Sequence, residues 1–304
     1  MTIVLSAAGV LLIVLVLHDI FTVLFRPGAK SWISAALAQA IWTLLRRAGG
    51  RHREVVALAG PIAVAAVISF WALALVLGWA LIYLPHYPDD YVLADGTAPH
   101  APLVGALHAS LTTVTTLGSA NVVPKTAWLQ VLGPVEALLG FGMLTAAVSW
   151  LLQIYPVLSR RRALAYEIHL LADTERRLEL DVAQLEVSVA AELYAELTSR
   201  VIAVERDLVK FPVTYYFAET DARFALAAAM PVLARIAEHG TAAEHRDAVR
   251  LRAEMLHEAV AELAETVVER FDVHRRHDAG DAIAAFAHDH GHDADGAGRQ
   301  ALAD

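Results

Sequence analysis

The sequence has no cysteine, and only 19% of its 304 residues are Asp, Glu, Lys or Arg. Without cysteine the chain can form no disulfide, thiolate metal site or cysteine nucleophile. Its 24 Lys and Arg against 33 Asp and Glu give a formal charge of −9, which disfavours a nucleic-acid-binding surface. Nucleic acid is therefore not an expected partner. The hydrophobic share of 57% instead indicates a membrane protein.

Three apolar segments are long enough to cross a bilayer, which takes about 20 residues of helix. Residues 55–88 contain no Asp, Glu, Lys or Arg, and the last segment stops before three consecutive arginines at 160–162. The first segment lacks the basic start of a signal peptide, so we expect a retained helix. It contains the adjacent His18 and Asp19, which we interpret as a polar break near the inner leaflet. The predicted spans are Ile3–Phe25, Val56–Leu84 and Trp128–Leu158.

The distribution of cations predicts the orientation, because short cytoplasmic loops carry an excess of Lys and Arg. The segment between the second and third spans has Lys125 as its one cation, so we expect it outside. The N-terminus is then outside, and the chain after Arg160 is cytoplasmic. The expected membrane is a prokaryotic inner membrane. The loop between the first two spans belongs inside because it holds the cations Arg26, Lys30, Arg46, Arg47, Arg51 and Arg53.

The inner loop also has an amphipathic pattern. Apolar residues recur at helical spacing from Ile33 to Leu45, with Trp32 and Trp42 beside them and arginines just beyond. This pattern predicts a helix in the inner membrane interface. The alternative is a soluble helix packed on the cytoplasmic domain, since both environments need the same stripe.

A second short segment, Leu103–Leu117, lies between the last two spans. It is helix-like, too short to cross a bilayer, and is followed by Gly118 and Pro124. A half-length helix that enters the membrane and returns as non-helical backbone is tolerated where protein or a water-filled cavity surrounds it. A span, a re-entrant helix with an extended return, and another span together are the arrangement of a pore.

The letters T-T-V-T-T-L-G-S-A-N-V-V-P at 112–124 resemble the potassium-channel pore family, whose filter reads T-V-G-Y-G-D after a Thr-rich pore helix. The resemblance covers about Val56 to Leu158. It implies a homotetramer in which four loops turn backbone carbonyls toward potassium ions, with no other cofactor and no catalytic residue. It also implies that the filter, with its ion-binding groups, consists of Thr115, Thr116, Leu117, Gly118, Ser119, Ala120 and Asn121.

Three filter letters depart from the family pattern. Ser119 replaces the tyrosine that fixes the filter diameter, Ala120 replaces the second glycine, and Asn121 replaces the aspartate. Left-handed torsions at alternate filter positions would cost about 1–2 kcal/mol at an alanine. The selectivity is thus open between potassium and monovalent cations in general. A non-conducting membrane sensor or scaffold, acting through its cytoplasmic helices, is the alternative function.

The last span contains candidate residues for filter support and gating. Glu136 lies about two turns into it, and we expect it to hydrogen-bond behind the filter to a pore helix that offers His108 and Thr112. A structural or snorkelling glutamate is the alternative. Gly140 and Gly142 lie near the position of the family's bending glycine and are predicted as a gating hinge. Close helix packing is the competing interpretation of these glycines.

After the third span the pattern becomes that of a helical cytoplasmic domain. Heptad-like apolar positions from Leu164 to Phe211 predict one coiled-coil-like helix, which ends at Pro212. It could bundle subunits or pack within one. Two further helices are expected, over Phe217–Glu238 and after a capping box at Thr241 and Glu244. No nucleotide-binding or metalloprotease motif occurs, and we expect no enzymatic activity.

The tail from His274 onward is rich in His, Asp and Gly, and its composition predicts disorder. His288, His290 and His292 are weak candidates for a metal site. The sequence as a whole predicts an all-α integral membrane protein with a tetrameric potassium-channel-like pore. The predicted domains are 1–55 (N-terminal span and interfacial helix), 56–158 (pore), 159–273 (cytoplasmic helices) and 274–304 (tail).

Overall fold

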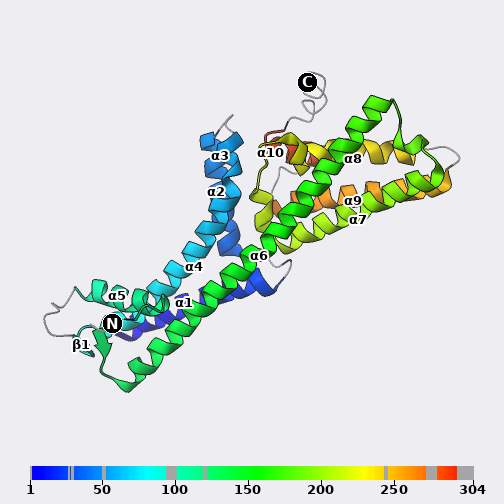
Figure 1. Ribbon diagram of the computed structural model, residues 1–304. Coiled ribbons are helices and arrows are strands. Elements are labelled where there is room, and N and C mark those ends of the chain that lie inside the picture. The colour runs from blue at the N-terminus through cyan, green and yellow to red at the C-terminus, as the bar shows by residue number, and fades with distance from the viewer. Residues whose placement is uncertain are drawn as a thin grey trace. The chain divides into compact units, whose positions relative to one another are not determined.

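The computed structural model describes residues 2–26, 28, 31–49, 53–93, 101–118, 122–242, 246–271 and 279–292. The chain divides into two compact units. The first unit consists of Met1–Ala40 and Ile62–Gln153, and the second of Ile41–Pro61 and Ile154–Asp304. The described residues are nearly all helical, as expected (Figure 1).

The elements of the first unit follow the predicted order of spans. Among the described residues, three helices are long and apolar enough to cross a membrane, and they coincide with the three expected spans. A shorter apolar helix lies between the second and third of them in the chain. The elements are α1 (Thr2–Phe25), α2 (Trp32–Gly49), α4 (Ala59–Tyr83), η1 (Leu84–His86), β1 (Tyr91–Leu93), α5 (Pro102–Val114), β2 (Val122–Pro124) and α6 (Ala127–Leu178).

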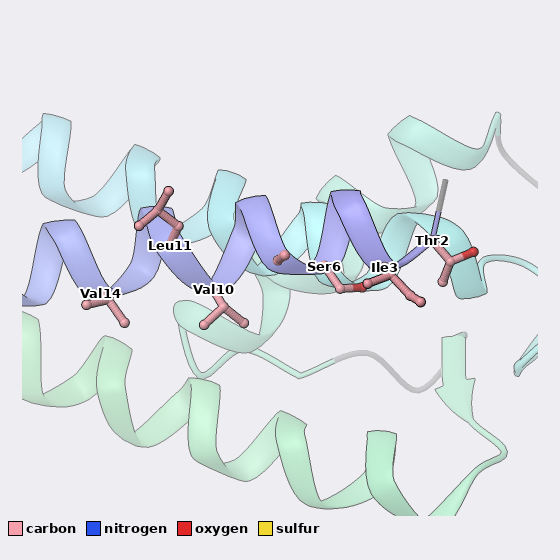
Figure 2. Close-up of a pocket in the computed structure, with 7 residues that line it drawn as sticks. Thr2, Ile3, Ser6, Val10, Leu11 and Val14 are labelled. Carbon is pink, nitrogen blue, oxygen red and sulfur yellow. The ribbon is translucent and has the colours of Figure 1, made fainter.

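Helix α1 packs on α4 through glycines. A Cβ on Gly9 would lie 2.4 Å from the Gly78 carbonyl oxygen, and one on Gly78 would lie 2.6 Å from Ile13 Cγ1. Small residues of this kind let two membrane helices approach closely. The opposite face of α1 is exposed and forms an open apolar groove (Figure 2). The residues that line the groove include Thr2, Ile3, Ser6, Val10, Leu11 and Val14.

A two-stranded antiparallel ribbon flanks α5 in the chain. Strands β1 and β2 pair with Tyr91 opposite Pro124 and Leu93 opposite Val122. The Lys125 N–H extends the pairing by donating to Asp90 O at 2.8 Å. The extended return after the filter was predicted, but its pairing partner was not. The ribbon closes the base of the loop that carries α5.

The predicted single helix from Leu164 to Phe211 is wrong. Helix α6 ends at Leu178, and a 3-10 turn, η2 (Val182–Gln184), precedes α7 (Val187–Lys210). Glu179 has a positive φ of 53°, a left-handed conformation that stops a helix. The Asp181 carboxylate then accepts from Ala183 N–H, so a short polar side chain stabilises the turn in place of helix.

The second unit is a helical domain with a core on α9. Besides α7 it contains α3 (Arg53–Ala57), η3 (Pro212–Tyr216), η4 (Ala222–Phe224), α8 (Leu226–Thr241), α9 (Asp247–Phe271) and α10 (Ala279–Asp289). Helices α7, α8 and α9 run side by side (Figure 1). The apolar face of α9 is buried at Val249, Ala253, Leu256, Val260, Leu263 and Val267.

The expected helix over Phe217–Glu238 starts later and ends later than predicted. Helix α8 begins at Leu226, after the separate turn η4, which the Asp221 carboxylate caps by accepting from Arg223 N–H. Thr241 is the last residue of α8, and its hydroxyl donates to Glu238 O. It therefore does not cap α9, and Glu244 lies outside the described residues.

The three arginines after the last span contact the rest of the second unit. Arg160 makes two hydrogen bonds to the Asp207 carboxylate on α7, at 2.7 and 2.9 Å. Arg161 is buried and donates to the carbonyl oxygens of Thr214, at 2.6 Å, and Phe217. These contacts attach α6 to α7 and to the segment around η3.

Part of the tail is folded, which corrects the prediction of disorder for that part. Helix α10 buries Ala282, Ile283, Phe286 and Ala287, whose spacing of one, three and one residues forms an apolar helical face. The prediction of disorder rested on the His-, Asp- and Gly-rich composition of the whole tail, in which this short stripe has little weight. The tail residues 272–278 and 293–304 lie outside the described residues.

Helix α10 packs on α8 and α9, and its C-terminal end also contacts the second half of α2. Trp42 is 5% exposed, and its ring lies 5.1 Å from the His290 ring and 5.9 Å from Tyr216. Arg46 forms an ion pair with Asp289, which also accepts from the Tyr215 hydroxyl at 2.5 Å. The C-terminal half of α2 therefore packs on the helical domain. This is what the alternative interpretation of the amphipathic stripe, a soluble helix packed on the cytoplasmic domain, predicts.

Candidate functional site

Helix α5 is held in the first unit by a face of small residues. Pro102 stands in its first turn, where a missing N–H costs nothing, and the helix ends after thirteen residues at Val114. It packs closely because its buried side chains are short. The buried residues of α5 are Gly105, Ala106, Ala109, Ser110 and Val114.

Two glycines set how closely α5 approaches its neighbours. A Cβ on Gly105 would lie 2.2 Å from the Tyr87 ring, and one on Gly140 would lie 2.2 Å from the Val114 carbonyl oxygen. The first contact fixes the start of α5 and the second fixes its end against α6. Any larger residue at either position would push α5 away.

The threonines at the end of α5 bond mostly to their own helix. The hydroxyls of Thr113 and Thr115 donate to Ala109 O and Leu111 O, both at 2.7 Å. The hydroxyl of Thr112 donates to His108 O at 2.8 Å. These bonds to the preceding turn satisfy the hydroxyl donors within the helix.

After α5 the backbone turns through left-handed torsions at alternate residues. Thr116 has a φ of 59° and Gly118 a φ of 74°. Glycine adopts this conformation without strain, whereas a β-branched threonine rarely does. The Gly118 N–H donates to Thr112 O at 3.0 Å, which folds the segment back on the helix end. Thr116, Leu117 and Gly118 are exposed in the single chain, and Leu117 is 79% exposed.

The remaining predicted filter residues, Ser119, Ala120 and Asn121, lie outside the described residues. The described part of the predicted filter is therefore Thr115 to Gly118. Its left-handed torsions lie at Thr116 and Gly118, and an ion-binding role for these residues stays a prediction.

Behind α5 lies a buried carboxylate. Glu136 on α6 has 0% exposure and accepts hydrogen bonds from Ser110 Oγ on α5 and Tyr83 Oη on α4, both at 2.6 Å. The Ser110 hydroxyl also lies 3.0 Å from Val76 O. Glu136 therefore connects α6 to both α5 and α4. A buried carboxylate with two donors is strongly favoured over one with none.

The partners of Glu136 differ from those expected. Thr112 bonds to its own helix, and His108 is exposed, so Ser110 takes the place of both. Tyr83 and Ser110 are the site residues that sequence reasoning missed. Ser110 could have been found, because it follows Ala106 at helical spacing on the small-residue face of α5.

The end of α4 and the ribbon extend this cluster with aromatic rings. The Tyr91 ring lies 6.5 Å from Tyr83 and 5.6 Å from Tyr87. Burial raises the pKa of the Tyr91 phenol, and the nearby Glu136 carboxylate raises it further. The phenol therefore stays protonated over the physiological pH range.

The glycines predicted as a hinge have different surroundings. Gly140 lies against α5, which is the close packing that the competing interpretation predicts. Gly142 has nothing within 4 Å of an added Cβ. Helix α6 is continuous through both residues. A hinge role for Gly140 and Gly142 stays a prediction.

The candidate metal ligands of the tail do not come together. The His290 ring is buried, with Nε2 2.9 Å from Tyr215 O and Nδ1 3.2 Å from Phe286 O. His288 is exposed, and His292 is buried. Among the residues that the structure describes, no group of three or more His, Cys, Asp or Glu could hold a metal ion.

Comparison with known proteins finds one family model that matches the part of the chain containing the site. Residues 68–155 match the family model described as "Ion channel". The uncharacterized membrane protein YdjJ of Bacillus subtilis (strain 168) is 24% identical over 162 residues, covering 53% of this chain and 47% of that protein. The chain thus spans about half the length of this curated relative. No solved structure matches the chain significantly.

Proposed function

We propose that residues 68–155, which match the ion-channel family model, form a potassium-channel-like pore, and that the protein is a passive channel for monovalent cations with potassium as its principal ion. Conduction needs no chemical step, so the proposal includes no catalytic residue and no cofactor other than the ions in the pore. The ion would exchange its hydration shell for carbonyl oxygens of Thr115 to Asn121.

The observation that carries the proposal is the position and ending of α5. A thirteen-residue helix lies in the chain between two helices long enough to span a membrane, and it ends in left-handed torsions at Thr116 and Gly118. These residues coincide with the predicted filter. Irregular backbone at membrane depth is tolerated where it lines a cavity or is surrounded by protein.

The exposed face of α6 supports a homotetramer. Between Glu136 and Gln153, large apolar side chains recur at steps of three and four residues with 49–69% exposure. An apolar stripe of this kind on a pore-forming helix suits contact with further copies or with the pore itself. The residues of this stripe are Leu138, Phe141, Leu144, Val148 and Leu152.

Lipid is the second proposed partner. The face of α2 that includes Trp32, 72% exposed, and Leu44, 66% exposed, is apolar, and Arg47 is exposed at its end. Such a face suits the headgroup boundary of the inner leaflet, with the N-terminus outside and the helical domain in the cytoplasm. A prokaryotic inner membrane fits this arrangement.

Ion flux from liposomes that contain the purified protein tests the proposal. Flux of K⁺, Na⁺ and a larger organic cation should be compared, and we expect K⁺ to be the fastest. Gly118→Ala should reduce the flux, because the positive φ of Gly118 disfavours a side chain by about 1 kcal/mol per subunit.

Gly133→Ala is the matched control, since an added Cβ there has nothing within 4 Å and the residue lies in a regular helix. It should conduct as the wild type does. Absence of flux for every ion, at any voltage or pH, would refute the channel. It would favour the alternative of a non-conducting sensor or scaffold.

A further inference from the structure

Asp19 is a buried carboxylate inside α1, the first membrane-spanning helix. It is 3% exposed and accepts hydrogen bonds from Ser31 Oγ at 2.6 Å, from Ser34 Oγ, and from Trp71 Nε1 at 2.8 Å. A polar group at this depth is costly unless its partners are supplied by protein. Three hydrogen-bond donors to one carboxylate indicate a specific structural site.

The donors come from two other helices. Ser31 and Ser34 stand at the start of α2, and both are buried although α2 is exposed on its other face. The Ala35 N–H donates to Ser31 O at 3.1 Å, so Ser31 is the residue from which α2 starts. The carboxylate of Asp19 thus attaches α1 to the start of α2.

Trp71 continues the contact toward α6. Its ring is 0% exposed and its centroid lies 5.6 Å from that of Trp150, which is 4% exposed. Trp150 follows Gly140 on α6 by about three turns, and Gly140 contacts the end of α5. A continuous set of buried contacts therefore leads from the start of α2 through Asp19 and Trp71 to the helix that follows the filter.

We propose that Asp19 is a positioning residue that couples α2 to α6 through Trp71 and Trp150, so that displacement of α2 changes the open fraction of the pore. This inference rests on the channel function proposed above. Among the described residues, Asp19 forms its hydrogen bonds with Ser31, Ser34 and Trp71, outside the predicted filter. Its loss should alter gating and leave the conduction path itself unchanged.

Two substitutions weaken the contact and keep most of the bulk of the side chains. Trp71→Phe removes the indole N–H that Asp19 accepts and keeps an aromatic ring against Trp150. Asp19→Asn keeps the size of the side chain but replaces one acceptor oxygen with a donor. Trp79→Phe is the matched control on the same helix, because Trp79 Nε1 has no hydrogen-bond partner among the described residues.

Single-channel recording in planar bilayers tests the proposal. Trp71→Phe and Asp19→Asn should change the open probability by at least about fivefold, the lower range of allosteric coupling, with the unitary conductance and the K⁺/Na⁺ permeability ratio unchanged. Trp79→Phe should change neither quantity. An open probability equal to that of the wild type in both variants overturns the proposal, as does an altered unitary conductance.

A second measurement separates this inference from the channel function. Because the chain has no cysteine, a spin label can be attached at Ala36→Cys, an exposed position of α2. Trp71→Phe and Asp19→Asn should increase the mobility of this label, and Trp79→Phe should not. A wild type without current refutes the channel, whereas unchanged label mobility refutes the role of Asp19.

Discussion

Gly140 lies directly against the main chain of Val114, with the Val114 carbonyl oxygen 2.2 Å from the position that a Cβ on Gly140 would occupy. Val114 is the last residue of α5, so this glycine sets the distance between α6 and the start of the predicted filter. A residue of this kind serves close packing, and its replacement should disturb the site itself.

Gly140→Ala should destabilise the protein by about 1–3 kcal/mol, because the added methyl overlaps backbone that cannot move without displacing α5. Thermal unfolding in detergent and liposome flux should both report the change. Gly142→Ala is the control: an added Cβ there has nothing within 4 Å, and alanine favours the helix by up to about 1 kcal/mol. Equal stability and flux for both variants would contradict the close contact.

Ser110→Ala and Tyr83→Phe should each cost about 1–3 kcal/mol of folding free energy, since each removes a donor from the buried Glu136 carboxylate. Thermal unfolding measures the loss. Ser149→Ala, an exposed position on α6, is the matched control and should have little effect.

Adding Glu136→Leu to the double variant Ser110→Ala/Tyr83→Phe should recover much of the lost stability, because a leucine at position 136 needs no hydrogen-bond donors. A triple variant that is less stable than the double variant would argue that Glu136 has another essential partner. Loss of a hydrogen bond to Glu136 weakens the support of α5. The K⁺/Na⁺ flux ratio should therefore fall together with stability in the single variants Ser110→Ala and Tyr83→Phe.

Ser119→Tyr combined with Ala120→Gly should raise the K⁺/Na⁺ flux ratio. The tyrosine restores the bulk that fixes the filter diameter in the family. The resemblance implies a left-handed torsion at position 120, where glycine is favoured over alanine by about 1–2 kcal/mol. Liposome flux of the two ions provides the ratio, with each single substitution as a control. A cellular role unaffected by the double substitution, together with absent flux, would favour the scaffold.

The docking of α10 should weaken on acidification. Burial lowers the pKa of His290 to about 4, and the nearby Arg161 and His292 also oppose its protonation, while the carbonyl of Tyr215 favours it. The neutral ring is therefore preferred in the folded state. Its contribution is complete above the ordinary histidine pKa of 6.5 and is lost as the pH falls from there to about 4.

Amide hydrogen exchange over residues 279–289 should therefore become faster between pH 6.5 and 4.5, after correction for the intrinsic rate. His290→Leu should abolish this pH dependence, and His288→Gln should preserve it because His288 is exposed. Exchange that stays equally slow at pH 4.5 and pH 7 in the wild type would contradict the assignment to His290.

The spans and the short helix were predictable because charge is costly in hydrocarbon, and a stretch as long as 55–88 without a charged residue is rare outside membrane-spanning helices. The face of α9 was predictable because its apolar residues repeat at helical spacing. In both cases the signal is local and extends over several turns.

The contacts of Glu136 and Asp19 could not be read from the sequence. Tyr83 lies 53 positions from Glu136, and Trp71 lies 52 from Asp19, so the pairing depends on how helices cross. The end of α6 depends on a single left-handed residue, Glu179, of a type that rarely marks a helix end. Helix α10 is apolar but short, and the His-, Asp- and Gly-rich residues around it dominate the composition of the tail.

The pairing of β1 with β2 joins the two ends of the segment 94–121, so α5 and the predicted filter are carried on one closed loop. Lengthening a loop whose ends are already tied costs little entropy. Insertions just after Leu93, before α5 begins, should thus leave the spans intact. A transplant of the whole loop into a related protein would also have to carry the α6 residues that α5 contacts, Glu136 and Gly140.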